Sequence, residues 1–468
     1  MNGSLVEELS PPPAVEEAFR RLASRRHCLF LDSARRDAAL GRYSFLTAEP
    51  FAWLRAAADG SDGLGHLSEQ LAPYRAETVP GLPPFQGGAA GLLGYDLCHS
   101  LERLPRAAHD DFPTPALACG LYDVVLAYDL SAGRAWIVSQ GFPETETAAR
   151  RRRAQARIEE FKRWLDDPVA ETAGVSPAPG ATPATDHLAP RFPIAARPGL
   201  VSNFSAEGYL RAVRRAIEYV RAGDIFQVNL SQRLMVPARG GAVDLYLRLR
   251  RRNPATFAGY FDLGDFQIVS ASPERFLQSR GGLVEARPIK GTRRRAPSPE
   301  ADLFSGDELL ESEKDRAENV MIVDLLRNDL SRVCRPESVQ VTQLCRLETY
   351  EYVQHLVSAV RGELRAGLSA LDLLRAAFPG GSITGAPKVR AMEIIAELEP
   401  TARGPYCGCL GYVGFDGALD TSILIRTITA GRGWWQFPVG GGIVAQSVPE
   451  REYEETWHKA EGLLRALE

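Results

Sequence analysis

Hydrophobic residues recur over residues 1–167 at the spacings of short strands and amphipathic helices. A helix is predicted over residues 14–24, where apolar positions recur every three or four residues. A second, strongly charged helix is predicted over 144–166. Short apolar runs between them predict strands at 28–31, 43–46, 52–56, 121–130 and 134–140.

Residues 168–199 interrupt this pattern, because they are rich in Pro, Ala and Thr and poor in large apolar side chains. That composition is typical of a linker or a long exposed loop. We therefore expect an N-terminal domain over 1–167, a linker over 168–199 and a second domain over 200–468.

The second domain has a denser pattern of predicted helices and strands. Ser205 is positioned to cap a helix that ends at Gly223. Further helices are predicted at 314–333, 368–377, 387–397 and from about 448 onward, and strands at 225–234, 256–261, 266–271, 283–289, 348–363, 410–415, 422–430 and 434–439. Strands and helices in mixed runs indicate an α+β protein with large sheets.

Composition narrows the class of protein. The chain has 468 residues, 45% of them hydrophobic and 24% charged, which is usual for a soluble globular protein. A net charge of −4 gives no indication of a nucleic-acid partner. We expect a cytoplasmic protein with no membrane partner, because the chain has neither a membrane-length apolar run nor the pattern of a signal peptide at its start.

The seven cysteines are scattered, and their spacing matches neither a zinc site nor a disulfide framework. They are interpreted as reduced thiols, as in cytoplasmic enzymes.

The first candidate for chemistry is Lys290, in the run EARPIKGT at residues 285–292. This run predicts a short strand that ends in a tight turn at Gly291. Alternation places Lys290 in one row with Val284 and Ala286, which are apolar. An amine drawn into an apolar pocket loses its proton more easily and becomes a nucleophile. On these residues alone, a solvated lysine at a strand end is the more common interpretation.

Two glutamates lie where packing would favour apolar groups. Glu274 precedes Lys290 on a segment that could form the neighbouring strand. A carboxyl group beside a nucleophilic amine could serve as a general acid, or the two could form an ordinary ion pair. Glu318 shares a helical stripe with Ile322 and Leu325, and a buried carboxylate requires a partner, for which a hard cation is one candidate.

Arg426 interrupts an apolar run in the strand predicted at 422–430. A guanidinium in that position requires a carboxylate, either from a ligand or from the protein. The triple glycine Gly440, Gly441 and Gly442 follows another strand and exposes N–H groups that suit an anion.

The C-terminal helix is predicted to open with a capping box formed by Ser447 and Glu450. On it, Glu452, Glu455 and Lys459 form a stripe separate from the apolar one. A surface ladder of ion pairs is the more common explanation of such a stripe.

Taken together, these motifs resemble those of the chorismate-utilising enzymes. The resemblance runs through residues 200–468 and is weaker over 27–130. The motifs are GDIFQVNLSQ at 223–232, SPERF at 272–276, PIKGT at 288–292, DLLRNDL at 324–330, GGSITGAPK at 380–388 and GGGIV at 440–444. The resemblance implies large antiparallel or mixed sheets packed as a sandwich with helices outside.

The same resemblance implies roles for individual residues. Glu318 and Glu455 correspond to ligands of Mg²⁺, and His355 to an active-site histidine. Positions that line the substrate site in relatives are Gly291, Thr292, Ser382, Tyr406, Arg426, Gly440, Gly441, Gly442 and Lys459. The role of Glu452, beside a metal ligand, is left open.

Position 290 separates the branches of the family, because anthranilate synthases have alanine where this chain has Lys290. The resemblance implies that this lysine attacks C2 of chorismate while Glu274 protonates the departing C4 hydroxyl. Ammonia then enters at C4 and gives 4-amino-4-deoxychorismate, the precursor of p-aminobenzoate and folate. Asn229, in place of an apolar residue, also fits this branch.

No Cys-His-Glu glutaminase apparatus is visible in the sequence, so a separate glutamine amidotransferase subunit is expected to supply the ammonia. The nearest alternative is anthranilate synthase component I. Isochorismate or salicylate synthases, in which water is the nucleophile, are a second alternative, and a catalytically silent tryptophan-binding regulator is a third. Ser33 matches a tryptophan-binding position of relatives, whereas NPATF at 253–257 departs from their Asn-Pro-x-Pro-Tyr.

Overall fold

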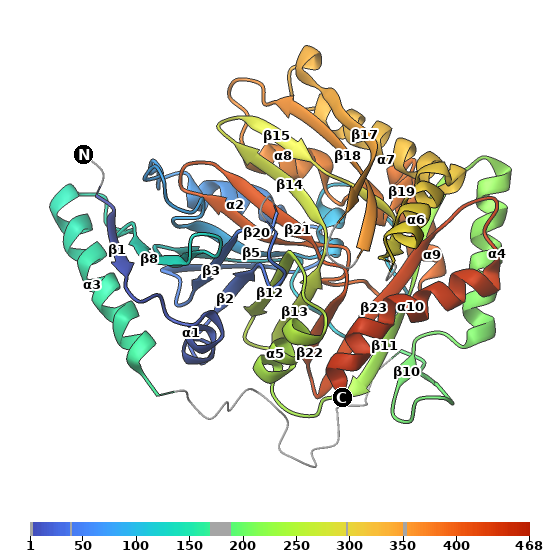
Figure 1. Cartoon of the computed structure of the whole chain (residues 1–468), viewed down its shortest axis with the longest axis horizontal. Coiled ribbons are helices and arrows are strands. Elements are labelled where there is room, and N and C mark those ends of the chain that lie inside the picture. Colours follow the sequence, from blue (N-terminus) through green and yellow to red (C-terminus); the bar gives the residue numbers. More distant parts are fainter. Residues whose placement is uncertain (1–2, 38–39, 169–188, 296–297, 350–352) are drawn as a thin grey trace.

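The computed structural model describes residues 3–37, 40–168, 189–295, 298–349 and 353–468 (Figure 1). Within these residues the strands form two large sheets, one of 13 strands and one of 10, and every strand pair is antiparallel.

The larger sheet combines strands from both ends of the chain. Its order is β1 (Leu5–Leu9), β8 (Arg134–Ser139), β7 (Val124–Asp129), β3 (Tyr43–Thr47), β2 (Leu29–Asp32), β12 (Phe257–Asp262), β13 (Phe266–Ser272), β22 (Thr427–Gly431), β23 (Trp434–Ile443), β11 (Gln227–Pro237), β10 (Val201–Ser202) and β9 (Phe192–Pro193), with β19 (Gly385–Ala386) beside β11.

The smaller sheet also combines strands from both ends of the chain. Its order is β16 (Ile289–Arg294), β18 (Val353–Glu363), β15 (Leu283–Ala286), β14 (Arg275–Arg280), β21 (Leu419–Ile423), β20 (Cys409–Gly414), β5 (Gly88–Leu93), β6 (Leu117–Tyr122) and β4 (Ala52–Ala56), with β17 (Gln340–Thr349) paired to β18. Both sheets therefore join strands from residues 1–167 with strands from 200–468. The linker predicted between these parts falls largely on residues 169–188, which lie outside the described residues.

Helices cover the outer faces of the two sheets (Figure 1). They are α1 (Val15–Leu22), α2 (Gly63–Leu71), α3 (Thr147–Asp166), α4 (Ala206–Ala222), α5 (Ala242–Arg252), α6 (Pro299–Glu311), α7 (Glu313–Ser331), α8 (Ala370–Ala377), α9 (Lys388–Leu398) and α10 (Pro449–Leu467), with short 3₁₀ turns η1 (Tyr95–Ser100), η2 (Pro336–Ser338) and η3 (Gly381–Ile383).

One hydrophobic cluster fills the space between the sheets, where Phe45 and Ile268 of the larger sheet meet Leu92 and Tyr412 of the smaller one. A second cluster lies under α1, α3, α5 and α10, and a third under α2, α7 and α8. This arrangement confirms the predicted α+β sandwich with helices outside.

Two glycines of β5 lie where the neighbouring strands leave no room for a side chain. A Cβ atom on Gly91 would lie 2.1 Å from the carbonyl oxygen of Ala118, and one on Gly88 2.3 Å from that of Val413. Backbones of neighbouring strands occupy the space of a side chain at both positions.

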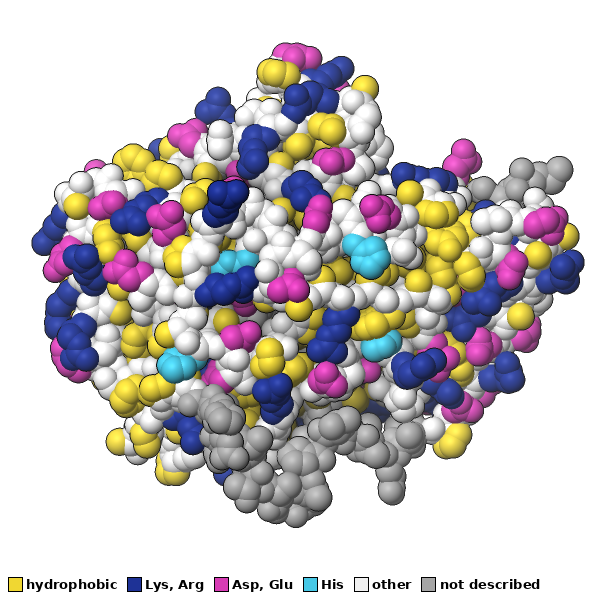
Figure 2. Space-filling model, turned by 180° about the vertical axis from the view of Figure 1, so that it is seen from behind, with side chains coloured by type: hydrophobic (Ala, Val, Ile, Leu, Met, Phe, Trp, Pro, Cys, Tyr) yellow, Lys and Arg dark blue, Asp and Glu magenta, His cyan; other side chains and the backbone are white. Residues whose placement is uncertain are grey.

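Several further features agree with the composition. None of the described helices has a stretch long and apolar enough to cross a membrane. Acidic and basic side chains are interspersed over the face in Figure 2 and do not form a large field of one sign. All seven cysteines are buried free thiols.

Candidate active site

A cavity of about 750 Å³ collects most of the predicted site residues. Strands of both sheets and helices α7 and α10 contribute to its wall. The predicted residues that line it are Glu274, Lys290, Gly291, Glu318, His355, Ser382, Tyr406, Arg426, Gly440, Gly442, Glu455 and Lys459. Segments that are distant in the sequence therefore meet in one hollow.

Lys290 lies in β16. The prediction of a tight turn after Lys290 is wrong. Gly291 has a φ of +69° and forms a bulge, after which the strand continues to pair with β18. A Cβ atom on Gly291 would lie 2.7 Å from Leu309 Cδ1, so glycine satisfies both the backbone and the packing. The bulge positions the Lys290 side chain so that its Nζ donates to the carbonyl oxygen of Ser382 at 3.4 Å.

Glu274 is buried between β13 and β14 and faces the same residue. The Ser382 hydroxyl donates to Glu274 Oε1 over 3.3 Å. Burial raises the pKa of Glu274 to about 7, against the opposing influences of the Lys290 charge and this hydrogen bond. A carboxyl group with that pKa carries a proton near neutrality, as a general acid requires.

Three more carboxylates approach the cavity from α7 and α10. Burial raises the pKa of Glu318 and of Glu452. Burial also opposes ionisation of Glu455, but Lys459 Nζ lies 2.6 Å from its Oε1 and its charge brings the pKa below the usual range. The stripe on α10 is thus turned toward the cavity, and its interpretation as a surface ladder is wrong for Glu452, which is buried.

These oxygens fit a hard divalent cation. Glu318 of α7 and Glu455 of α10 line the same cavity. Oε2 of Glu452 is buried without a hydrogen-bond partner among the described residues. No group of three or more His, Cys, Asp or Glu side chains suited to a metal occurs in the described part of the chain. Mg²⁺ typically binds one or two carboxylates and completes its shell with water and substrate oxygens.

Ser447 does not cap helix α10, contrary to the prediction. Helix α10 begins after Val448, which makes no side-chain cap. The Ser447 hydroxyl instead donates to Oε1 of Glu452 at 2.6 Å, which orients that carboxylate.

Cationic and main-chain groups form the other side of the cavity. Arg426 lies in a break between β21 and β22 rather than within one strand, with a φ of +53°. Its half-buried guanidinium donates to the carbonyl oxygen of Lys459 at 2.9 Å, and partial burial lowers its pKa. A non-glycine residue in this backbone conformation is strained, and such strain is common at functional sites.

The glycine run leaves the wall of the cavity without side chains. A Cβ atom on Gly440 would lie 2.4 Å from the carbonyl oxygen of Leu230. Lys459 Nζ donates to the Gly440 carbonyl at 2.7 Å. Gly441 faces α10, because a Cβ atom there would lie 3.3 Å from Oε1 of Glu455.

His355 lies on β18 opposite Thr292 and borders the cavity. Burial lowers the pKa of His355 to about 4, so the imidazole is neutral near pH 7. The side chain of Thr292 lies outside the described part of the structure.

Sequence reasoning missed two groups beside the cavity. Lys314 lies one turn before Glu318 on α7, with its Nζ 4.0 Å from Glu318 and 3.7 Å from Glu452. The second group is the buried ion pair of Arg403 with Glu399, at 2.7 Å. The spacing i, i+4 between opposite charges within each pair was the available signal.

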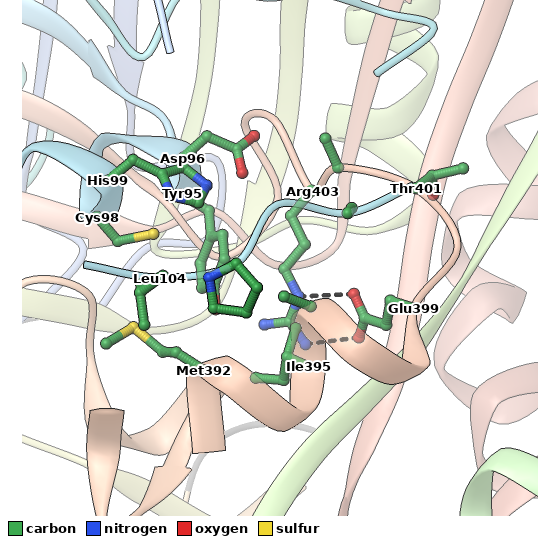
Figure 3. A pocket seen from close by; sticks show the side chains of 14 residues that line it. Tyr95, Asp96, Cys98, His99, Leu104, Met392, Ile395, Glu399, Thr401 and Arg403 are labelled. Carbon is green, nitrogen blue, oxygen red and sulfur yellow. Dashed lines mark hydrogen bonds and ion pairs between the residues drawn. The ribbon is translucent and has the colours of Figure 1, made fainter. Parts of the chain in front are cut away.

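Figure 3 shows the Arg403 and Glu399 pair in a small hollow between η1 and α9. Arg403 also donates to the carbonyl oxygens of Ile383 and Asn229, two residues that line the larger cavity. The pair therefore holds two segments of the cavity wall in place.

Ser33 lies in a different cavity, of about 350 Å³, between the two sheets. Its hydroxyl donates to the carbonyl oxygen of Tyr43 at 2.6 Å. Tryptophan binding there stays a prediction.

Comparison with known proteins identifies one matching family and several similar enzymes. Residues 27–465 match the family described as chorismate binding enzyme. Aminodeoxychorismate synthase component 1 of Klebsiella aerogenes is 40% identical over 471 residues, covering 98% of this chain and 97% of that protein. Anthranilate synthase component 1 of Thermus thermophilus is 44% identical over 392 residues, covering 84% of this chain and 80% of that protein. The crystal structure of anthranilate synthase component I from Streptococcus pneumoniae matches with a TM-score of 0.74 and 31% identity, covering 92% and 93% of the two chains.

Proposed function

Because the chain belongs to the chorismate binding enzyme family, we propose that it is the large subunit of an aminodeoxychorismate synthase. In this proposal, it converts chorismate and ammonia to 4-amino-4-deoxychorismate. The observation that carries the proposal is that Lys290 lines the same cavity as Glu274 and both candidate metal ligands, where its charge opposes the raised pKa of Glu274 and of Glu318.

The first half of the proposed reaction uses Lys290 and Glu274. The free amine of Lys290 forms a bond to C2 of chorismate, the ring double bonds shift, and the C4–O bond breaks. Glu274 gives its proton to the departing oxygen, so water leaves. A pKa of about 7 suits Glu274 to this task, because near pH 7 about half of these carboxyl groups carry a proton that they can still give up readily.

Glu318 and Glu455 would hold Mg²⁺, and Glu452 would support that pair. When bound, the ion supplies positive charge that holds a substrate carboxylate and stabilises developing negative charge. Arg426 and the amides of the glycine run, which also lines the cavity, would hold a second carboxylate.

The second half of the reaction requires ammonia. We propose that a glutamine amidotransferase subunit supplies it in the cytoplasm, on the way to p-aminobenzoate and folate. Support comes from relatives named component 1, a name that implies a second component.

One experiment tests the function directly. The chain is incubated with chorismate, Mg²⁺ and an ammonium salt, with and without a lyase that releases p-aminobenzoate from aminodeoxychorismate. We expect p-aminobenzoate only when the lyase is present. Anthranilate formed without the lyase would instead show an anthranilate synthase, the second candidate, which the 44% identity to the Thermus thermophilus protein favours.

A further inference from the structure

Lys314 connects the two helices that carry the candidate metal ligands. It is the second residue of α7 and lines the cavity. Its Nζ lies 4.0 Å from Oε1 of Glu318 on the same helix and 3.7 Å from Oε1 of Glu452 on α10. Both distances are too long for hydrogen bonds, so the contacts are ion pairs. The ammonium group therefore pairs with carboxylates of both helices.

The carboxylates on this side of the cavity form a compact group. A Cβ atom on Gly441 would lie 3.3 Å from Oε1 of Glu455 and 3.4 Å from Oε2 of Glu452, so these two side chains lie beside the same point of the wall. Burial raises the pKa of Glu318 and of Glu452, and the positive charge of Lys314 opposes this rise at both. Several carboxylates in a partly buried place repel one another and require a cation to stay ionised.

Lys314 and Mg²⁺ would compete for one of these carboxylates. The proposed metal ligands are Glu318 and Glu455, and Lys314 already pairs with Glu318. Two cations at one carboxylate repel each other, and a divalent ion repels the ammonium twice as strongly as a monovalent ion does. The side chain of Lys314 is 52% exposed on a flexible stem, so its ammonium can move into the solvent, whereas Glu318, which is 14% exposed, stays in the wall.

Other roles for Lys314 agree less well with these contacts. A lysine that binds a substrate carboxylate would keep its charge free for the ligand, whereas Lys314 already pairs with two carboxylates of the protein. An ordinary surface ion pair would have two exposed partners, whereas the side chain of Glu452 is only 5% exposed. The contacts therefore favour a role toward the carboxylates themselves.

We propose that Lys314 is a built-in competitor of the metal, an inference that rests on the metal ligands of the proposed function. The Lys314 ammonium neutralises Glu318 and Glu452 before Mg²⁺ binds, and it moves into the solvent when Glu318 becomes a metal ligand. Lys314 thereby lowers the affinity of the cavity for Mg²⁺. A substrate carboxylate adds negative charge that favours the divalent ion, so the metal and the substrate bind best together.

The test titrates the wild-type chain, Lys314→Met and Lys314→Arg with Mg²⁺ by isothermal titration calorimetry, at low salt and without chorismate. Methionine keeps a long flexible side chain and removes the charge. We expect Lys314→Met to bind Mg²⁺ about 3- to 10-fold more tightly, because a partly exposed competing charge is lost. Lys314→Arg keeps the charge and should stay within about twofold of the wild-type affinity. The gain should shrink at about 0.5 M KCl, because salt screens a half-exposed charge.

Melting temperatures separate this role from a purely structural one. In EDTA, Lys314→Met should melt at a lower temperature than the wild-type chain, because the carboxylates lose their cation. Saturating Mg²⁺ should remove this difference, since the metal then supplies the charge. The Mg²⁺ concentration at half of this rise gives a second measure of affinity. An equal loss of melting temperature with and without Mg²⁺ would indicate an ion pair that only stabilises the helix, and it would overturn the inference.

Arg316→Met is the matched control. Arg316 is an exposed cation two residues later on α7, and it donates to the carbonyl oxygen of Leu310 at 3.3 Å instead of pairing with a cavity carboxylate. The control removes one positive charge from the same turn of the helix. Its affinity for Mg²⁺ should stay within about twofold of the wild-type value.

An affinity of Lys314→Met for Mg²⁺ equal to or weaker than that of the wild-type chain would overturn the inference. The proposed ligands are judged separately with Glu318→Gln, which should weaken Mg²⁺ binding and abolish the gain from Lys314→Met in the double variant. A loss in Glu318→Gln without a gain in Lys314→Met would overturn the inference alone. Wild-type affinity in Glu318→Gln would overturn both the ligand and the inference. The identity of the reaction product does not enter, because the titrations contain no chorismate.

Discussion

Glu274 and Lys290 both contact Ser382. The hydroxyl of Ser382 donates to Glu274 Oε1 at 3.3 Å, and its carbonyl oxygen accepts from Lys290 Nζ at 3.4 Å. The Lys290 charge favours ionisation of Glu274, but burial outweighs it and leaves the pKa of Glu274 at about 7. The geometry thus places an acid and an amine beside one another, each held by a different group of Ser382.

Replacing Lys290 with alanine should remove the nucleophile and leave the fold intact. We expect the formation of aminodeoxychorismate to fall by roughly 1,000-fold or more, to the level of slow direct addition. The measurement is a coupled assay with the lyase, together with circular dichroism to check folding. Lys162→Ala, at a surface ion pair with Glu7, is the control and should retain full activity. Wild-type turnover by Lys290→Ala would contradict the proposed covalent step.

The pH dependence should report the proton on Glu274. Its raised pKa means that the carboxyl group is mainly protonated below about pH 7 and loses its proton above it. If Glu274 is the general acid, kcat/KM falls as the pH rises through about 7. Glu274→Gln should lower kcat by roughly 10²- to 10⁴-fold and abolish this limb of the profile. A variant that keeps the wild-type alkaline limb would exclude Glu274 as its source.

Removal of the metal should stop the reaction, and loss of the Glu318 carboxylate should lower the affinity of the protein for Mg²⁺. We expect EDTA to abolish turnover and Mg²⁺ to restore it. Glu318→Gln should weaken Mg²⁺ binding by roughly 100-fold or more, as judged by isothermal titration calorimetry. Asp324→Asn provides the control, because Asp324 lies exposed on the same helix. Identical titrations of Glu318→Gln and the wild-type chain would count against Glu318 as a ligand.

Loss of the buried ion pair between Arg403 and Glu399 should lower the free energy of unfolding. Arg403→Met leaves the Glu399 carboxylate buried without its cation, at a cost of about 3–5 kcal/mol. We expect a lower midpoint of urea unfolding. The double variant Arg403→Met/Glu399→Leu should recover part of this loss, since it removes the second charge as well. If the single variant unfolds at the wild-type urea concentration, the pair does not support the cavity wall.

Local features of the fold could be predicted from the sequence because neighbouring residues produce them. Helix α4 is an example: Ser205 caps its start by accepting from the N–H of Gly208, and Gly223 ends it in the left-handed conformation. Three local predictions failed where distant groups intervened. Gly291 forms a bulge because β18 continues to pair beyond it, Arg426 lies in a break between strands, and the Ser447 hydroxyl binds Glu452 instead of capping a helix.

The sequence by itself determined the family and the candidates for the reacting groups, because Lys290 and Glu274 lie in motifs whose residue types limit the possible chemistry. Only the tertiary structure decided which groups meet. Glu318 and Glu455 lie far apart in the sequence and line one cavity. Antiparallel pairing and helix packing bring such residues together, and burial then sets their pKa values and their need for partners, which spacing along the chain does not encode.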